Sequence, residues 1–261
     1  MGTVLYLAAI CFVVAAIQLK TDASPPETLN ENPGLTTDNQ WNSDAAACHK
    51  DLRLSKLWVT PPAKRKKATH SEPKQLVVEH TGEAWSETGS SSSTGSRPLS
   101  SAASKNIWER SVFAVEQIPK SGIFYYEVKI KMKGWRHVFI GLATKQMKLN
   151  EGVGPAKNTY AYASKGFIWG HEVKGCEHGV NKRPYINKEI PKFKDGQVVG
   201  CGVDLKNGKI FYTLDGEIVI AGLSVNANLP LFPCVTLTNK GQKIEANFGR
   251  DFLFKLEKLK N

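Results

Sequence analysis

The sequence predicts an all-β fold, an antiparallel β-sandwich of two sheets, and three observations lead to this prediction. Apolar and polar residues alternate along residues 122–133. Further short apolar runs follow as far as residue 248, and turn signals separate them. Only residues 252–260 have the pattern of a short helix. Many short strands between tight turns are typical of a sandwich.

The first long strand is the clearest element, because its alternation assigns a direction to each side chain. A strand with one buried face shows a period of two residues. One face carries Tyr126, Val128, Ile130 and Met132, and the other carries Glu127, Lys129, Lys131 and Lys133. The second face is therefore expected to lie in solvent.

The later strands are expected at 138–143, 198–220, 231–237 and 244–248. Within 198–220 two apolar runs flank Asn207-Gly208, and a second turn follows at Asp215-Gly216. Asn-Gly and Asp-Gly supply the positive φ that two-residue hairpin turns require. Both sites are therefore predicted to be tight hairpin turns.

The N-terminus carries an apolar run over residues 5–17, which is shorter than the roughly 20 residues that span a bilayer. Small residues at Ala15, Ala16 and Ala23 offer cleavage sites, and polar sequence follows. This pattern predicts a signal peptide over residues 1–23 and a secreted protein with no membrane segment after its removal.

The rest of the chain is expected to be one domain with two insertions. Residues 24–40 are polar and predict a flexible linker. The domain covers residues 41–261. A basic, Pro-containing stretch at about 60–73 and a Ser-rich stretch at about 83–105 predict disordered insertions.

The formal net charge is +11, and Lys and Arg are spread along the chain. Nucleic-acid recognition is not expected, since no zinc-finger spacing or aromatic RNA-binding motif accompanies the charge. One dense basic run is a candidate nuclear-import patch, with a solvated loop as the alternative. It consists of Lys64, Arg65, Lys66 and Lys67.

Five cysteines are present, and Cys11 lies in the predicted leader. The remaining four are an even number, which would permit two disulfides in a secreted chain. Cys201 and Cys234, however, lie inside apolar strand-like runs, where a free thiol packs as a small hydrophobe. The four cysteines of the mature chain are therefore expected to be free.

No catalytic motif is recognisable, and no enzyme activity, cofactor or metal site is expected. His171-Glu172 begins like a zinc-protease helix, but Gly175 stands where the second histidine must be. His171, Cys176 and His178 lie close together in a Gly-rich stretch that predicts a surface loop rather than three convergent zinc ligands.

Seven segments, in order, resemble the SPRY domain in its Ran-binding-protein-like branch. The resemblance covers about residues 41–250 and departs from the family at Val153-Gly154-Pro155, where a Gly-Trp is expected, and at Asp215-Gly216, where Asn-Gly is usual. The matching segments are Gly122-Ile123-Phe124-Tyr125-Tyr126-Glu127-Val128, Ile140-Gly141-Leu142, Tyr160-Ala161-Tyr162, Gly196-Gln197-Val198-Val199-Gly200-Cys201-Gly202-Val203-Asp204-Leu205, Ile210-Phe211-Tyr212-Thr213-Leu214-Asp215-Gly216, Leu231-Phe232-Pro233 and Asn247-Phe248-Gly249.

A SPRY domain behind a leader is similar to the SPRYSEC effectors that plant-parasitic cyst nematodes secrete into host cells. Residues 41–52 resemble the start of the domain in that group. The resemblance implies a monomeric virulence protein that binds host proteins in the host cytoplasm, or in the nucleus if the basic run acts, and modulates plant immunity.

In related SPRY domains, loops at one edge of the sandwich form a groove for a partner. The resemblance places Glu116, Gln117, Tyr162, Thr238 and Asn239 in such a groove. Trp135 and Arg136 are added because Trp and Arg are frequent interface anchors. These loops are expected to converge into one patch, and the alternative for Trp135 and Tyr162 is a core position. Trp108 and Trp169 are expected in the core.

Two other functions stay open. Sandwiches of this shape are similar to legume lectins, so an extracellular carbohydrate binder is one alternative, although no acidic cluster has calcium-loop spacing. A nucleic-acid binder driven by the +11 charge is the other, and it would show a steep salt dependence of binding.

Overall fold

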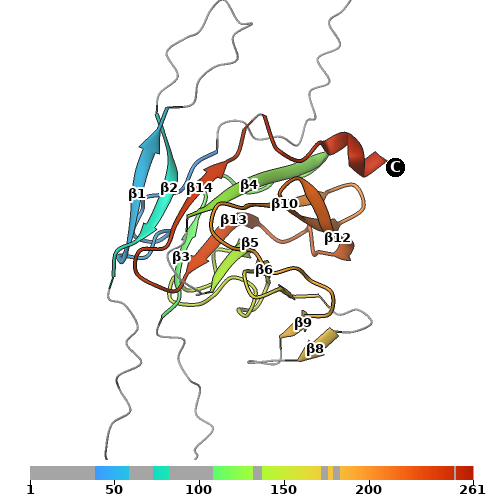
Figure 1. Ribbon diagram of the computed structural model, residues 1–261, viewed down its shortest axis with the longest axis horizontal. Coiled ribbons are helices and arrows are strands. Elements are labelled where there is room, and N and C mark those ends of the chain that lie inside the picture. Colours follow the sequence, from blue (N-terminus) through green and yellow to red (C-terminus); the bar gives the residue numbers. More distant parts are fainter. Residues whose placement is uncertain are drawn as a thin grey trace, which may run out of the picture. The chain divides into compact units, whose positions relative to one another are not determined.

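The computed structural model describes residues 39–58, 73–82, 108–131, 137–171, 176–178, 183–249 and 251–260. They form two antiparallel sheets of seven strands each, as the sequence predicted (Figure 1). The predicted leader, the Ser-rich insertion and the basic run at Lys64, Arg65, Lys66 and Lys67 lie outside the described residues. The predicted linker is also outside them up to residue 38; its last two residues are described, and Asn39 is buried.

The first sheet runs from the β1–β2 hairpin to the hairpins of residues 198–224, which Figure 1 shows at opposite ends. Its outermost strands are β1 and β12, so each has one strand neighbour. In spatial order the strands are β1 (Leu52–Leu57), β2 (Lys74–His80), β14 (Lys243–Asn247), β4 (Ile123–Lys131), β10 (Val198–Asp204), β11 (Lys209–Leu214) and β12 (Glu217–Ser224).

The longest strands of the second sheet are β13 and β5, which are apolar along almost their whole length. In spatial order its strands are β3 (Arg110–Phe113), β13 (Leu231–Leu237), β5 (Val138–Thr144), β6 (Thr159–Ala163), β7 (Phe167–Trp169), β9 (Pro184–Ile186) and β8 (Cys176–His178).

The strand order does not follow the chain, because late strands are inserted between early ones. In the first sheet β14 lies between β2 and β4, and in the second sheet β13 lies between β3 and β5. The sandwich is therefore not a simple up-and-down arrangement, and the ends at which its loops meet have to be traced strand by strand.

The main core lies between the two sheets. Val128 and Ile130 of β4 and Val235 of β13 are fully buried there. The hydroxyl of Tyr126 donates a 2.7 Å hydrogen bond to the carbonyl of Gly141, which joins β4 to β5 across the core. The predicted inward face of β4 is therefore correct for the residues that the structure describes.

The outer face of β4 is also covered, which corrects the prediction that it lies in solvent. Residues 251–260 return over this face and end in the 3-10 helix η3 (Leu256–Lys260). Phe252 and Phe254 pack on Tyr125 and Phe211, with ring centroids of Tyr125 and Phe252 4.9 Å apart. Lys129 and Lys131 are exposed as expected, but Glu127 is only 4% exposed because this C-terminal segment covers it.

The two predicted hairpin turns differ. Asp215 and Gly216 have φ values of 50° and 80°, which makes the two-residue turn that the sequence predicted. The β10–β11 connection instead has four residues between Asp204 and Lys209, and Gly208 alone among them has a positive φ. Asp204 closes this wider turn, since its carboxylate accepts hydrogen bonds from Lys206 N and from the Asn207 side chain.

Candidate functional site

The predicted site residues are divided between the two ends of β13. Thr238 and Asn239 directly follow the strand, at Leu237. Glu116 and Gln117 lie near its beginning, because Ile118 N donates to the carbonyl of Leu231. A strand of this length covers about 20 Å. The expectation that these two pairs converge into one patch is therefore wrong.

Tyr162 lies in the core and is fully buried. Its hydroxyl donates a 2.6 Å hydrogen bond to the carbonyl of Pro191, and its ring packs edge-on against Phe193 and Tyr212. Burial raises the pKa of its phenol. Tyr162 therefore occupies a core position, the alternative to a groove residue, and its ring presents no surface to a partner.

Thr238 and Asn239 are held in place by one buried glutamine. The side-chain oxygen of Gln242 accepts the backbone N–H groups of Thr238 at 2.7 Å and of Asn239 at 3.0 Å. Gln242 is fully buried, and its backbone carbonyl accepts from His80 N of β2. The β13–β14 loop is thus fixed from inside the protein.

The same glutamine joins this loop to the segment that enters β5. Gln242 Nε2 donates to the carbonyl of His137 at 3.3 Å, and the Thr238 hydroxyl donates to the same carbonyl at 2.8 Å. Trp135 and Arg136 immediately precede His137 in the chain but lie outside the described residues. The structure therefore places the chain that follows them beside Thr238.

Sequence reasoning placed Trp108 in the core, but the structure exposes 37% of it. Leu237 pairs with Arg110, so Trp108 lies at the same end of the sandwich as Asn239. We define the loop end as Trp108, His137, Thr238, Asn239 and Lys240. Trp169 lies partly buried against a small apolar cluster, in line with its expected core position.

A charged cluster supports the loop end from the side of the first sheet. Arg110 Nε binds Asp51 Oδ2 at 2.6 Å, and this hydrogen bond lowers the pKa of the Asp51 carboxyl. Burial lowers the pKa of both His49 and His80, and the Arg110 charge lowers each further. Burial thus favours the neutral form of both histidines, and the basic side chains around them are Arg110, Lys50 and Lys240.

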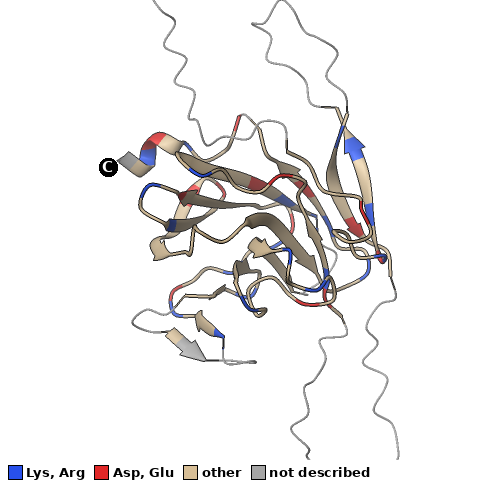
Figure 2. Ribbon diagram, turned by 180° about the vertical axis from the view of Figure 1, so that it is seen from behind, with Lys and Arg blue, Asp and Glu red and all other residues tan. Residues whose placement is uncertain are grey.

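Elsewhere Figure 2 shows Lys and Arg dispersed over several strands and loops of the described residues, with Asp and Glu among them. Several form surface pairs, such as Arg53 with Glu79 and Lys131 with Glu245.

No group of three or more His, Cys, Asp and Glu side chains in the described ranges is arranged to hold a metal ion. Within the same ranges, no helix is long and apolar enough to cross a membrane.

Residues 123–251 match the family model described as the SPRY domain. The match begins at β4, so β1, β2 and β3 lie outside it. Even so, β2 pairs with β14 and β3 pairs with β13, whereas β1 pairs with β2. The segment from Phe252 onward, which covers Tyr125 and Phe211, lies beyond it as well.

The chain is similar to Ran-binding proteins. Ran-binding protein 9 of Xenopus laevis is 38% identical over 151 residues, which are 56% of this chain and 25% of that protein. Human Ran-binding protein 9 is 37% identical over 151 residues and 19% of its own length. The Ran-binding proteins 9/10 homolog of Drosophila melanogaster is 34% identical over 154 residues, 57% of this chain and 14% of that protein. This chain thus spans a quarter or less of these relatives.

Proposed function

Residues 123–251 constitute a SPRY domain, a protein-interaction module, and from this premise we propose that the protein is a secreted effector that binds a host protein through the loop end. The observation that carries the proposal is the Gln242 clamp, which fixes Thr238 and Asn239 beside His137. A loop held in one conformation binds at a lower entropic cost than one that orders on contact.

The loop end also offers the composition of a binding surface. Trp108 supplies an exposed aromatic ring, and tryptophan is enriched among residues whose truncation costs most binding energy. Lys240 is exposed at the same end of the sandwich, where Arg110 pairs with Leu237. A partner with acidic and apolar groups fits this combination.

Secretion followed by action inside a host cell is supported by two features of the chain. The apolar run at residues 5–17 has the pattern of a cleavable leader. Cys48, Cys176, Cys201 and Cys234 are all free thiols, which suits a reducing cytosol. The host-protein partner and the modulation of plant immunity follow from the resemblance to secreted nematode effectors.

The alternatives receive less support. A calcium-dependent carbohydrate site needs a cluster of oxygen ligands, and the described residues offer no metal-holding group. A nucleic-acid site needs concentrated positive charge, whereas Figure 2 shows it dispersed over the described residues.

The test is proximity labelling in plant cells that express residues 24–261 fused to a biotin ligase. The proposal expects a reproducible set of labelled host proteins that Trp108→Ala reduces at least several-fold. Trp58→Ala is the matched control, because Trp58 is 76% exposed and follows β1 at the opposite end from the Leu52–His80 pair. Equal labelling by wild type and Trp108→Ala would refute the loop end as the binding surface.

A further inference from the structure

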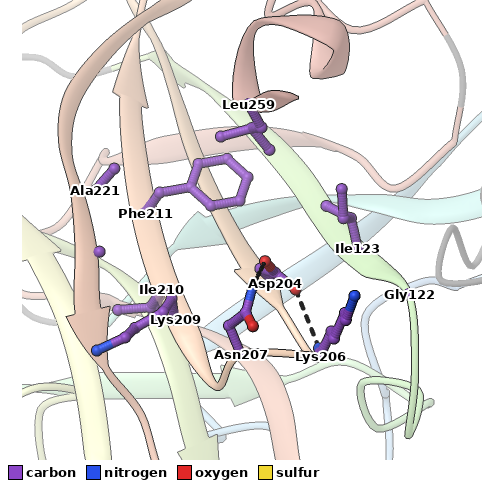
Figure 3. Close-up of a pocket in the computed structure, with 11 residues that line it drawn as sticks. Gly122, Ile123, Asp204, Lys206, Asn207, Lys209, Ile210, Phe211, Ala221 and Leu259 are labelled. Carbon is purple, nitrogen blue, oxygen red and sulfur yellow. Dashed lines mark hydrogen bonds between the residues drawn. The ribbon is translucent and has the colours of Figure 1, made fainter. Parts of the chain in front are cut away.

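A cavity of about 620 Å³ opens on the outer face of the first sheet, at the end opposite to the loop end (Figure 3). Its position follows from β4, which begins at Ile123 beside the cavity, whereas Lys131 at its other end pairs with Lys243, next to Gln242. The volume lies within the range of roughly 300–1,000 Å³ that ligand sites occupy.

Two local irregularities shape this cavity. In the β11–β12 pairing, Ile210 opposes Leu223 but Tyr212 opposes Ile220, so Ala221 and Gly222 form a bulge. Gly222 adopts a φ of 80°, which a glycine accommodates without strain. The bulge forms one wall of the cavity.

The C-terminal segment forms the opposite wall. Leu259 of η3 lies across from Ala221, and the Phe211 ring lies between them (Figure 3). Ile123 adds a further apolar side chain from β4. One half of the cavity is therefore apolar, and it exists only while residues 251–260 are docked on the sheet.

The other half of the cavity is cationic. Asp204 is the one acidic residue in its lining, and both of its oxygens accept hydrogen bonds within the β10–β11 turn. Lys209 Nζ binds the Ser224 hydroxyl and Lys206 Nζ has no partner among the described residues. Neither ammonium group has a carboxylate partner there, so a ligand carboxylate would supply the missing opposite charge.

A protein segment fits better than a small molecule, because the cavity adjoins an open strand edge. β12 is the last strand of its sheet in the described part of the chain, and residues 218–223 within it are all uncharged. An open edge presents backbone donors and acceptors to an extended segment. Such a segment can lie along β12 and direct a side chain past Ala221 toward Phe211.

We propose that this cavity binds an extended segment of a protein partner in which an apolar side chain stands next to Asp or Glu. The apolar side chain occupies the space between Phe211 and Leu259, and the carboxylate lies against Lys206 and Lys209. The inference rests on the proposed function, protein binding, and adds a second surface remote from the loop end.

The test is a titration of ¹⁵N-labelled protein, residues 24–261, with the peptide acetyl-Glu-Leu-Phe-Glu-amide. Saturable shifts are expected at the amides of residues 206–211 and 221–222, with a Kd of about 1 mM or tighter. The peptide acetyl-Lys-Leu-Phe-Lys-amide has the same apolar core and is expected to cause no saturable shift at these residues.

Charge-reversed variants separate this site from general attraction to a basic protein. The double variant Lys206→Glu/Lys209→Glu is expected to weaken peptide binding about tenfold or more, since two favourable charge contacts become repulsive. The matched control is Lys188→Glu/Lys192→Glu, which changes the net charge equally at two exposed lysines outside the cavity lining. Ala221→Trp, which fills the cavity, is expected to abolish the shifts.

Saturable shifts located elsewhere, or equal weakening by both double variants, would overturn the inference. Self-association that Ala221→Trp abolishes, seen by sedimentation, would also overturn it, because the occupant would then be a second copy. The proposed function is judged separately: host-protein labelling that depends on Trp108 while the peptide fails to bind would refute the cavity site alone.

Discussion

Glu127 Oε1 accepts a hydrogen bond of 2.9 Å from the backbone N–H of Phe254, a residue 127 positions later in the chain. Its other oxygen accepts Leu253 N at 3.0 Å, and the Tyr125 hydroxyl donates to Oε1 at 2.9 Å. One buried carboxylate on β4 thus holds the C-terminal segment on the sheet. That segment in turn provides the Leu259 wall of the outer cavity.

Replacement of Glu127 by Gln is expected to lower the free energy of unfolding by about 1–3 kcal/mol. The amide keeps one acceptor, but its NH₂ group faces a backbone N–H and leaves that buried donor unsatisfied. Denaturant unfolding measures the change. The control is Glu245→Gln, which loses only a surface pair with Lys131 and should cost under about 1 kcal/mol. Equal costs for the two variants would contradict the buried clamp.

Replacement of Tyr162 by Phe is expected to cost about 1 kcal/mol of stability, because the carbonyl of Pro191 loses its 2.6 Å hydrogen bond. Thermal unfolding reports this loss, and Tyr160→Phe, whose hydroxyl accepts an exposed 3.2 Å bond, is the milder control. Host-protein labelling should stay at the wild-type level. Lost labelling with unchanged stability would assign Tyr162 a direct role in binding.

The imidazole of His171 should make the protein less stable in mild acid. Burial lowers its pKa to about 4, although Nδ1 is hydrogen-bonded to the carbonyl of Ser224. In the unfolded chain the same imidazole has its ordinary pKa of about 6.5. Between pH 6.5 and 4 the unfolded state binds a proton that the folded state does not, so this contribution to stability falls across that window and levels off below it.

The variant His171→Phe isolates this effect, since it keeps an aromatic ring on Tyr160, whose ring centroid lies 5.0 Å away. The loss of unfolding free energy between pH 7.5 and pH 4.5 should shrink by on the order of 2 kcal/mol relative to wild type. Parallel pH profiles for the two proteins would show that His171 does not titrate differently on unfolding.

Thiol labelling should distinguish Cys176 from the other cysteines. Burial raises the pKa of Cys48 to about 11, and it raises the pKa values of Cys201 and Cys234 well above their usual range. Cys176 is only half-buried. Native protein of residues 24–261 should therefore take up one maleimide quickly, and unfolded, unreduced protein should take up four. A total of two or none after unfolding would reveal disulfides.

The alternation along β4 correctly predicted a strand and its inner face, because that pattern is local. It could not show that the outer face is buried, since the cover comes from Phe252 and Phe254. Gly200 and Gly202 of β10 are a local sign of the side chains packed on this outer face. A Cβ at either position would overlap side chains on the outer face, Tyr125 and Thr213 for Gly200 and Phe211 for Gly202.

The placement of the site residues depended on topology that no local pattern contains. Thr238 and Glu116 were expected together, but they lie at opposite ends of β13. β3 runs antiparallel to β13, so the chain that follows β3 lies at the start of β13, whereas Thr238 follows its end. The β10–β11 connection was misjudged for a different reason. Asp204 binds Lys206 N and Asn207, and this side-chain closure favours a four-residue turn over the two-residue turn that Asn-Gly favours.

The Gln242 clamp determines which positions of this loop can vary in evolution. The backbone of the β13–β14 loop is fixed by a fully buried side chain, Gln242, together with the Thr238 hydroxyl. The side chains at Asn239 and Lys240 contribute neither of these bonds. Lys240 is also exposed, so it can be exchanged without loss of these bonds, and recognition can diversify at that position while the framework stays constant.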